Sequence, residues 1–184
     1  GIPVEVNESH HWSLRDAHDT IGVATAYLAA YNAKKMGVSN YIAQYMFNVP
    51  PNISPKMDLA KMLAKIEMIE SLEDKNFKTY RQVRAGLASL PPDLYSAKGQ
   101  LAASTYIAMA IKPHIVHVVG YCEAHHAATP EDIIESCKIV RGVIKNCMQG
   151  MPDFTQDMEV INRKNQLIEE AKFLLDAINK ITPN

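Results

Sequence analysis

The chain has 184 residues, and its 19 basic and 20 acidic side chains give a formal net charge of −1 at pH 7. This length makes one domain of ordinary size, which buries roughly 70% of the surface that the unfolded chain exposes. The balanced charge gives no basic surface for nucleic acid or an anionic membrane, and no apolar run is long enough to cross a bilayer. The three cysteines fit neither CxxC nor CxxH spacing, so we expect no disulfide framework or structural zinc site, and a reducing, cytoplasmic setting.

Strand and helix patterns alternate through the first half of the chain. Residues 3–7 are predicted to form a strand, and a helix pattern over 16–36 follows and ends at a glycine. A second strand is predicted over 41–47. The next helix, over 54–71, begins with a Ser-Pro pair that supplies an N-cap and a proline at the first helical position.

The same alternation continues through the second half. A strand is predicted over 78–84, and after a Pro-Pro turn a helix begins at residue 94 or 96 and runs to 111. Residues 115–120 are the most apolar strand pattern of the chain. A helix over 130–148 opens on Thr-Pro-Glu-Asp, and a final helix is predicted over 157–181.

The predicted fold class is α/β, with four consecutive βα units and a long C-terminal helix. Such crossovers favour a parallel sheet covered by helices. We interpret residues 1–150 as half of a TIM-type (β/α)8 barrel, because a complete barrel needs about 250 residues, and residues 151–184 as a helix that packs on it. A small doubly wound sheet is the competing architecture, and in both cases function collects at the carboxyl ends of the strands.

Polar side chains follow the first and the last predicted strands. Imidazoles after the first strand can stack on a planar cofactor, donate a hydrogen bond or bind a metal, although a loop histidine can also have no role. The candidate cofactor-binding residues at the strand ends are Ser9, His10, His11 and Asn48. Glu123 follows the most apolar strand, where desolvation would raise its pKa, and it suits contact with an ammonium group or work as a general base. Its alternative role is capping or a structural ion pair.

Two arginines belong to the third predicted strand. Arginine is a bidentate clamp for a substrate carboxylate. Alternation places Arg81 and Arg84 on opposite faces, so at most one of them faces a site. Arg84 lies nearer to the end of the strand. The arginine that does not face the site is expected to form an ion pair on the surface.

Three stretches carry a resemblance to a known family: residues 10–22 (HHWSLRDAHDTIG), 48–54 (NVPPNIS) and 123–132 (EAHHAATPED). Over nearly its whole length the chain resembles the barrel domain of the large subunit of D-ornithine 4,5-aminomutase, in the wider group of the glutamate mutase (methylaspartate mutase) E chain. The resemblance implies an adenosylcobalamin-dependent radical isomerase. In such an enzyme pyridoxal phosphate holds the amine of a small amino-acid substrate at the top of the barrel.

The resemblance also implies roles for individual residues. By position, His10 would lie against the pyridoxal ring, Arg81 or Arg84 would hold the substrate carboxylate, and Glu123 would contact the substrate amine. His10 and Glu123 are therefore the candidate catalytic residues. His18 misses the cobalamin-binding DxHxxG pattern by one residue, so we expect it in the first turn of a helix.

The family pattern is also incomplete here. The Schiff-base lysine and the cobalamin domain of such enzymes lie on a segment that this sequence lacks, and only about half a barrel is present. We therefore expect the remaining strands and the cobalamin domain on another segment or chain, and a homo- or hetero-oligomer.

Three other functions stay open. A carbon-skeleton mutase of the glutamate type needs no pyridoxal phosphate and would use arginines to grip two carboxylates. A metal-dependent barrel hydrolase or isomerase would use Glu8, His10, Glu123 and His125 as ligands. A non-catalytic half-barrel would function by assembly, because it exposes two sheet edges that must pair.

Overall fold

The computed structural model of the chain describes residues 2–6 and 17–181 and has an α/β fold in which parallel strands alternate with helices. The strands are β1 (Val4–Val6), β2 (Asn40–Phe47), β3 (Lys78–Ala85) and β4 (Ile115–Val116). The helices are α2 (Asp19–Lys35), α3 (Pro55–Glu70), α4 (Leu94–Ala108), α5 (Pro130–Cys147) and α6 (Met158–Ile181). Short 3₁₀ turns are η1 (Leu87–Ser89), η2 (Met109–Ile111) and η3 (Phe154–Gln156).

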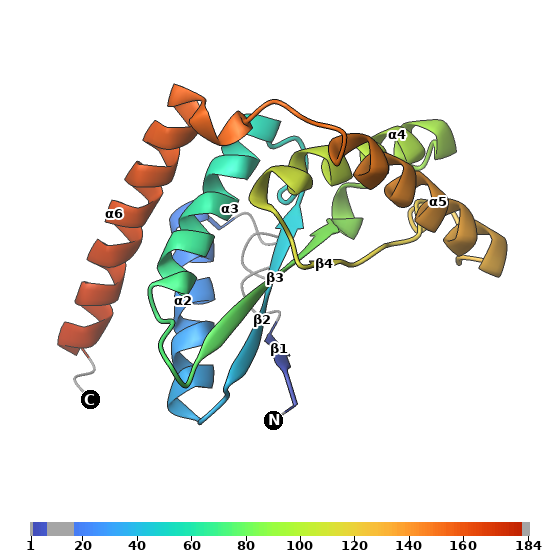
Figure 1. The fold of residues 1–184 in the computed structure, drawn as a ribbon. Helices are drawn as coiled ribbons and strands as arrows, with labels where there is room; N and C mark the ends of the chain where they lie inside the picture. The colour runs from blue at the N-terminus through green and yellow to red at the C-terminus, as the bar shows by residue number, and fades with distance from the viewer. Residues whose placement is uncertain (1, 7–16, 182–184) are drawn as a thin grey trace.

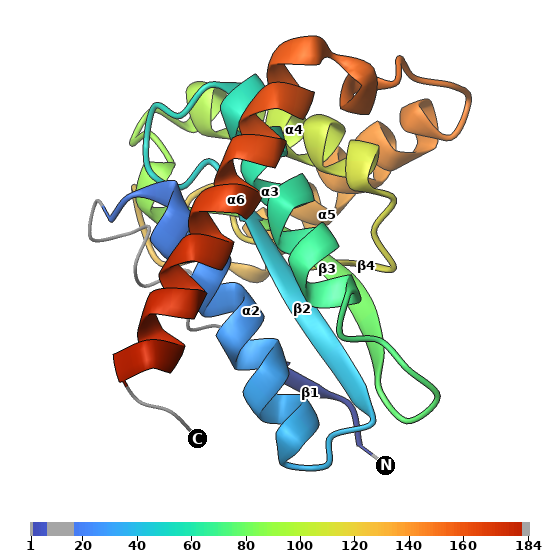
Figure 2. The same cartoon turned by 90° about the vertical axis from the view of Figure 1, so that its left-hand side faces the viewer.

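The four strands form one sheet in the order β1-β2-β3-β4, and every neighbouring pair is parallel. Helices α2 and α3 lie side by side on one face of this sheet, and α6 packs outside them as a further layer (Figures 1 and 2). Helix α4 packs on β3, and α5 packs on α4. The predicted α/β class and the long C-terminal helix are therefore confirmed.

The helix ends follow from local sequence signals. The Ser54 hydroxyl accepts a hydrogen bond from Met57 N (3.3 Å), which caps α3, and the Asp93 carboxylate accepts one from Ser96 N (2.7 Å), which caps α4. His18 is the N-cap of α2, where its Nδ1 accepts from the Thr20 amide. The predicted helix boundaries lie within three residues of the observed ones, because such caps depend on residues close in sequence. His18, which is expected in the first turn of a helix, instead precedes α2.

The main core lies between the sheet and its helices. Alternate residues of β2 face the helices, and Tyr41, Tyr45 and Phe47 are fully buried against Leu59 and Met62 of α3. A second apolar cluster joins α2, α3 and α6, and a third joins β3 to α4, α5 and the segment after β4. Three contiguous clusters thus fix the helices on one side of the sheet.

The opposite face of β1, β2 and β3 is not covered by α2, α3 or α4, and it carries a row of polar side chains. We call it the polar face and define it by Glu5, Gln44, Gln82 and Arg84. Alternation and the register Gln44↔Gln82 and Met46↔Arg84 place these residues on the same side of the sheet.

The predicted fourth strand is present and parallel to β3, but it is shorter than the predicted range 115–120 and is not buried. Only Ile115 and Val116 pair with β3, and Ile115 is 38% exposed. The chain then leaves the sheet, so that Val119 and Cys122 pack against α4 and α5 instead. The apolar character of this segment therefore reflects helix packing rather than a central strand. None of the helices in the described part of the chain combines the length and the apolar character that a membrane span requires.

The turn after β3 yields a stability prediction. A Cβ on Gly86 would overlap with Val49 Cγ2 and lie 2.9 Å from Phe47 O, whereas one on Gly99 in α4 would meet nothing within 4 Å. We expect Gly86→Ala to lower the free energy of unfolding by about 1–3 kcal/mol. Gly99→Ala should raise it by about 0.5–1 kcal/mol. Urea unfolding of the two variants checks this, and a Gly86→Ala protein as stable as the wild type would contradict it.

Candidate functional site

The polar face contains a hydrogen-bonded group in which one exposed carboxylate meets two buried amides. Glu5 Oε1 accepts from Gln44 Nε2 (2.5 Å) and from Gln82 Nε2 (2.8 Å), so one carboxylate joins β1, β2 and β3. Both glutamines are buried. The Oε1 atom of Gln44 and the Nε atom of Arg84 are also buried but have no hydrogen-bond partner in the described part of the chain. Buried polar atoms of this kind are rare and favour a site that a ligand completes.

Asn48 directly follows the carboxyl end of β2. It adopts a positive φ of 62°, which asparagine tolerates better than most residues. Its backbone N–H donates to Asp58 Oδ2 (2.5 Å), and its side-chain Oδ1 is a further buried atom with no partner among the described residues. Arg84 is therefore a cationic donor toward the end of β3, and the amide oxygens of Gln44 in β2 and Asn48 after β2 are acceptors.

The two arginines of β3 lie on opposite faces, as alternation predicts. Arg81 faces the helices, where Glu70 accepts from its Nε (2.6 Å) and its Nη2 (2.9 Å), and where its Nη1 donates to Ile111 O (2.7 Å). The hydrogen bond to Glu70 raises the pKa of Arg81. Arg81 is thus engaged in a structural ion pair, while Arg84 belongs to the polar face.

A buried cluster of charges lies where α2, α3 and the loop after β2 meet. Lys61 is fully buried; its Nζ donates to Val49 O and lies 3.3 Å from Asp19 Oδ1 and 3.6 Å from Asp58 Oδ1. Lys65, one turn further along α3, is 1% exposed. Together these contacts tie α3 to the strand end that carries Asn48.

Burial shifts the titration of this cluster. Desolvation lowers the pKa of Lys65 to about 7, and the neighbouring charge of Lys61 adds to this effect. Desolvation also raises the pKa of Asp58 to about 6, although Lys61 and the Asn48 amide oppose it. The fold therefore holds a lysine that can lose its proton near neutral pH.

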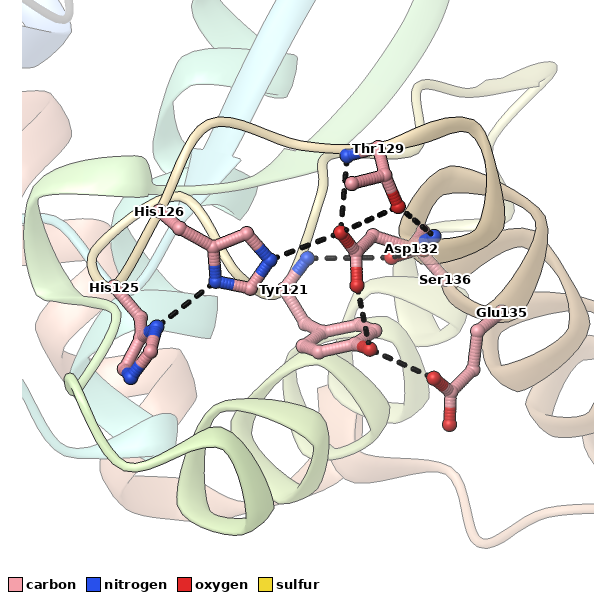
Figure 3. Close-up of polar contacts among 7 residues, drawn as sticks. All are labelled: Tyr121, His125, His126, Thr129, Asp132, Glu135 and Ser136. Atoms are coloured by element: carbon pink, nitrogen blue, oxygen red, sulfur yellow. Dashed lines mark hydrogen bonds and ion pairs between the residues drawn. The ribbon is translucent and has the colours of Figure 1, made fainter.

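A second polar network surrounds the turn after β4 and the start of α5 (Figure 3). Asp132 Oδ2 accepts from the Thr129 amide (2.9 Å) and lies 3.0 Å from His126 Nε2, whose Nδ1 lies 2.8 Å from His125 Nδ1. The Tyr121 hydroxyl oxygen lies 3.0 Å from Asp132 Oδ1 and 2.7 Å from Glu135 Oε2, so its single proton is shared between two carboxylates. We call these residues the histidine–aspartate network.

The hydrogen bonds of the network shift the pKa values of Asp132 and Tyr121 in opposite directions. The hydrogen bond from the Thr129 amide, followed by that from His126, holds the pKa of Asp132 well below its usual range. The Glu135 carboxylate and partial burial raise the pKa of the Tyr121 hydroxyl. Lys98 Nζ pairs with Glu135 (2.6 Å) and lies 4.6 Å from the centre of the Tyr121 ring. Tyr121 is therefore a neutral donor between two ionised carboxylates.

The structure separates the residues that the sequence singles out. Ser9, His10 and His11 lie outside the described residues, as does Glu8 of the alternative metal set. Glu123 is exposed on the turn after β4, where its Oε1 accepts from Gly120 N (3.3 Å). The expectation that it lies at the end of a buried strand is therefore wrong. No hydrogen bond or ion pair within the described ranges joins Glu123 to Arg84 or Asn48.

Sequence reasoning missed the buried amides and the buried lysines. Gln44 and Gln82 each stand at the parity opposite to the buried core residues of their strand, and this alternation indicates a polar inner face. The buried stripe of α3 includes Asp58, Lys61 and Lys65 at helical spacing. The burial of these charged residues could therefore have been predicted from the sequence. The link between His126 and Asp132 has no such signal, because it depends on how the turn folds back.

No protein-family model matches the chain, and no curated protein sequence matches it. The function proposed below rests on the geometry of the polar face and on the resemblance of the sequence.

The buried lysines give a pH-dependent prediction. Because the pKa of Lys65 is about 7 when folded and 10.5 ordinarily, the unfolded chain holds the extra proton between these values. Stability should therefore rise with pH across this window. We expect Lys65→Met to remove this rise and the exposed control Lys138→Met to keep it, as measured by urea unfolding at several pH values. A Lys65→Met protein with the wild-type pH dependence would refute the assignment.

The histidine–aspartate network gives a further prediction. Tyr121→Phe removes the hydroxyl whose proton lies between two carboxylates, and the unfolding free energy should fall by about 1–3 kcal/mol. Tyr95 is 84% exposed, so Tyr95→Phe is the matched control and should change little. Equal unfolding midpoints in urea for the two variants would show that the Tyr121 hydroxyl does not stabilise the turn.

Proposed function

We propose that this chain forms half of a (β/α)8 barrel and supplies the substrate-binding strand ends of an aminomutase that acts on a small amino acid such as D-ornithine. The observation that carries the proposal is the polar face, where Arg84 presents a buried Nε donor without a partner among the described residues. The enzyme would be an isomerase that depends on adenosylcobalamin and pyridoxal phosphate, as the resemblance to D-ornithine 4,5-aminomutase implies.

The sheet order supports the half-barrel. A doubly wound sheet reverses its strand order at a switch point, whereas the described strands run β1-β2-β3-β4 without a reversal. Right-handed crossovers in a sequential order put all connecting helices on one face, as in a barrel. The other face would then become the inside of the barrel, and its polar residues would line the site.

The edges of the sheet support the same conclusion. Strand β1 is an edge, and beside it lies an open apolar groove of about 470 Å³ whose lining includes Val4, Val6, Leu28 and Val38. Unpaired edges and apolar grooves are what a neighbouring βα unit covers in a closed barrel. The remaining strands would come from another segment, another chain or a second copy.

The strand ends fit an amino-acid zwitterion. Arg84 would bind the carboxylate, because a guanidinium is the natural partner of that group. The unpartnered amide oxygen of Gln44 would accept a hydrogen bond from an ammonium group of the substrate. Glu5 would act indirectly, since it holds the Gln44 and Gln82 amides in place.

The described residues also bear on whether the two cofactors fit this chain. Pyridoxal phosphate, when bound, supplies a carbonyl for the substrate amine, and adenosylcobalamin supplies the radical chemistry. Among the described residues the buried Asn48 Oδ1 fits a hydrogen-bond donor of the pyridoxal group. The chain itself would bind the substrate carboxylate, orient the substrate amine, and exclude water from the buried amide oxygens.

A two-carboxylate substrate of the glutamate type fits less well. It would need two arginines at the strand ends, but Arg81 is on the helix side and paired with Glu70. Only Arg84 of that pair belongs to the polar face. This distribution favours a substrate with one carboxylate and one or more amines.

Calorimetric titration of the chain with D-ornithine, in the presence of pyridoxal phosphate, tests the proposal. We expect saturable binding that Arg84→Gln weakens by about 10–100-fold, because a charge-assisted hydrogen bond contributes about 1.5–3 kcal/mol. Arg81→Gln is the matched control from the same strand, and it should lose stability but keep its affinity. A folded wild-type protein that binds no D-ornithine, or an Arg84→Gln variant with unchanged affinity, would contradict the proposal.

A further inference from the structure

The turn after β4 brings together three side chains of different chemistry. Cys122, His126 and Asp132 each offer one ligand atom, and these atoms lie within 4.8 Å of one another. We propose that Cys122, His126 and Asp132 form a zinc-binding site, with a fourth position open to water. The site is separate from the polar face and does not depend on the proposed aminomutase function.

The ligand set selects the metal. A thiolate, an imidazole and a carboxylate are the three side-chain ligands that proteins use for Zn²⁺, whereas Mg²⁺ and Ca²⁺ prefer oxygen ligands alone. The two negative charges of Cys122 and Asp132 would balance the charge of the ion. Three protein ligands with a fourth position open to water are the arrangement of catalytic zinc sites.

The distances suit one tetrahedral ion. His126 Nε2 and Asp132 Oδ2 are 3.0 Å apart, and two such ligands at ~2.0–2.1 Å from a tetrahedral ion would be about 3.3 Å apart. A shift of a few tenths of an ångström would therefore let zinc replace the proton between these atoms. Cys122 is fully buried, while His126 is exposed. The ion would therefore bind a buried thiolate on one side and be accessible to solvent on the other.

The surrounding hydrogen bonds orient the ligands. His125 Nδ1 lies 2.8 Å from His126 Nδ1, so with zinc on Nε2 the proton of His126 would sit on Nδ1 and be donated to His125. The Tyr121 hydroxyl binds Asp132 Oδ1, which turns Oδ2 toward His126 (Figure 3). Ligand histidines and carboxylates in metal sites are commonly fixed by partners of this kind.

The site would join two segments of the fold. Cys122 and His126 belong to the turn, and Asp132 belongs to the first turn of α5. A bound ion would cross-link the turn to the helix, where the Thr129–Asp132 capping box already starts α5. Zinc would thus fix the position of Glu123, which lies on the same turn.

Cobalt substitution tests the site. The full chain, without a histidine tag and in reducing buffer, is titrated with Co²⁺ and then with Zn²⁺ while the absorbance is recorded. We expect one Co²⁺ per chain, with a thiolate-to-cobalt charge-transfer band and intense tetrahedral d–d bands that Zn²⁺ abolishes. A folded wild-type protein that shows no thiolate band would overturn the proposal.

Matched variants assign the ligands. Cys122→Ala should lose the charge-transfer band, whereas Cys147→Ala, which removes another buried cysteine, should keep it. His126→Ala changes an exposed residue, so the fold survives, and it should weaken Co²⁺ binding at least ~100-fold. His125→Ala should weaken binding by about 10–100-fold but keep the band. A band that persists in Cys122→Ala, or wild-type affinity in His126→Ala, would show that the metal binds elsewhere.

Discussion

The one-sided path of the chain is the constraint on which the rest of the structure depends. Each parallel strand must be followed by a crossover, and in the order β1-β2-β3-β4 the crossovers α2, α3 and α4 run on the same side. The buried apolar residues of β2 and β3 therefore face the helices, and the opposite parity carries Gln44, Gln82 and Arg84 beside Ile42 and Met46. The polar face is a direct result of this topology.

The polar groups on that face carry the functional account. The exposed Glu5 accepts one hydrogen bond from the amide of each of two buried glutamines, which links three strands on the side of the sheet away from α2 and α3. The acceptors and the guanidinium that remain without partners in the described residues lie toward the carboxyl ends of β2 and β3. A barrel would enclose these atoms, and an amino acid would complete their hydrogen bonds.

Much of the secondary structure was predictable, because its signals are local. The Ser54-Pro55 pair and the Thr129–Asp132 box mark helix starts that the structure reproduces. The length of β4 was not predictable from the sequence, because the number of paired residues depends on the partner strand and on how Val119 packs against the helices. The contact of Glu5 with Gln82 spans 77 residues and depends on strand register, which composition and periodicity do not reveal.

Hydrogen–deuterium exchange of the backbone amides, with and without D-ornithine and pyridoxal phosphate, tests the central claim that the polar face is the binding face. The account predicts slower exchange on ligand addition at the ends of β2 and β3, around residues 44–48 and 82–86, and unchanged exchange in α5. Unchanged exchange at both strand ends, or protection confined to the turn at residues 121–126, would contradict it.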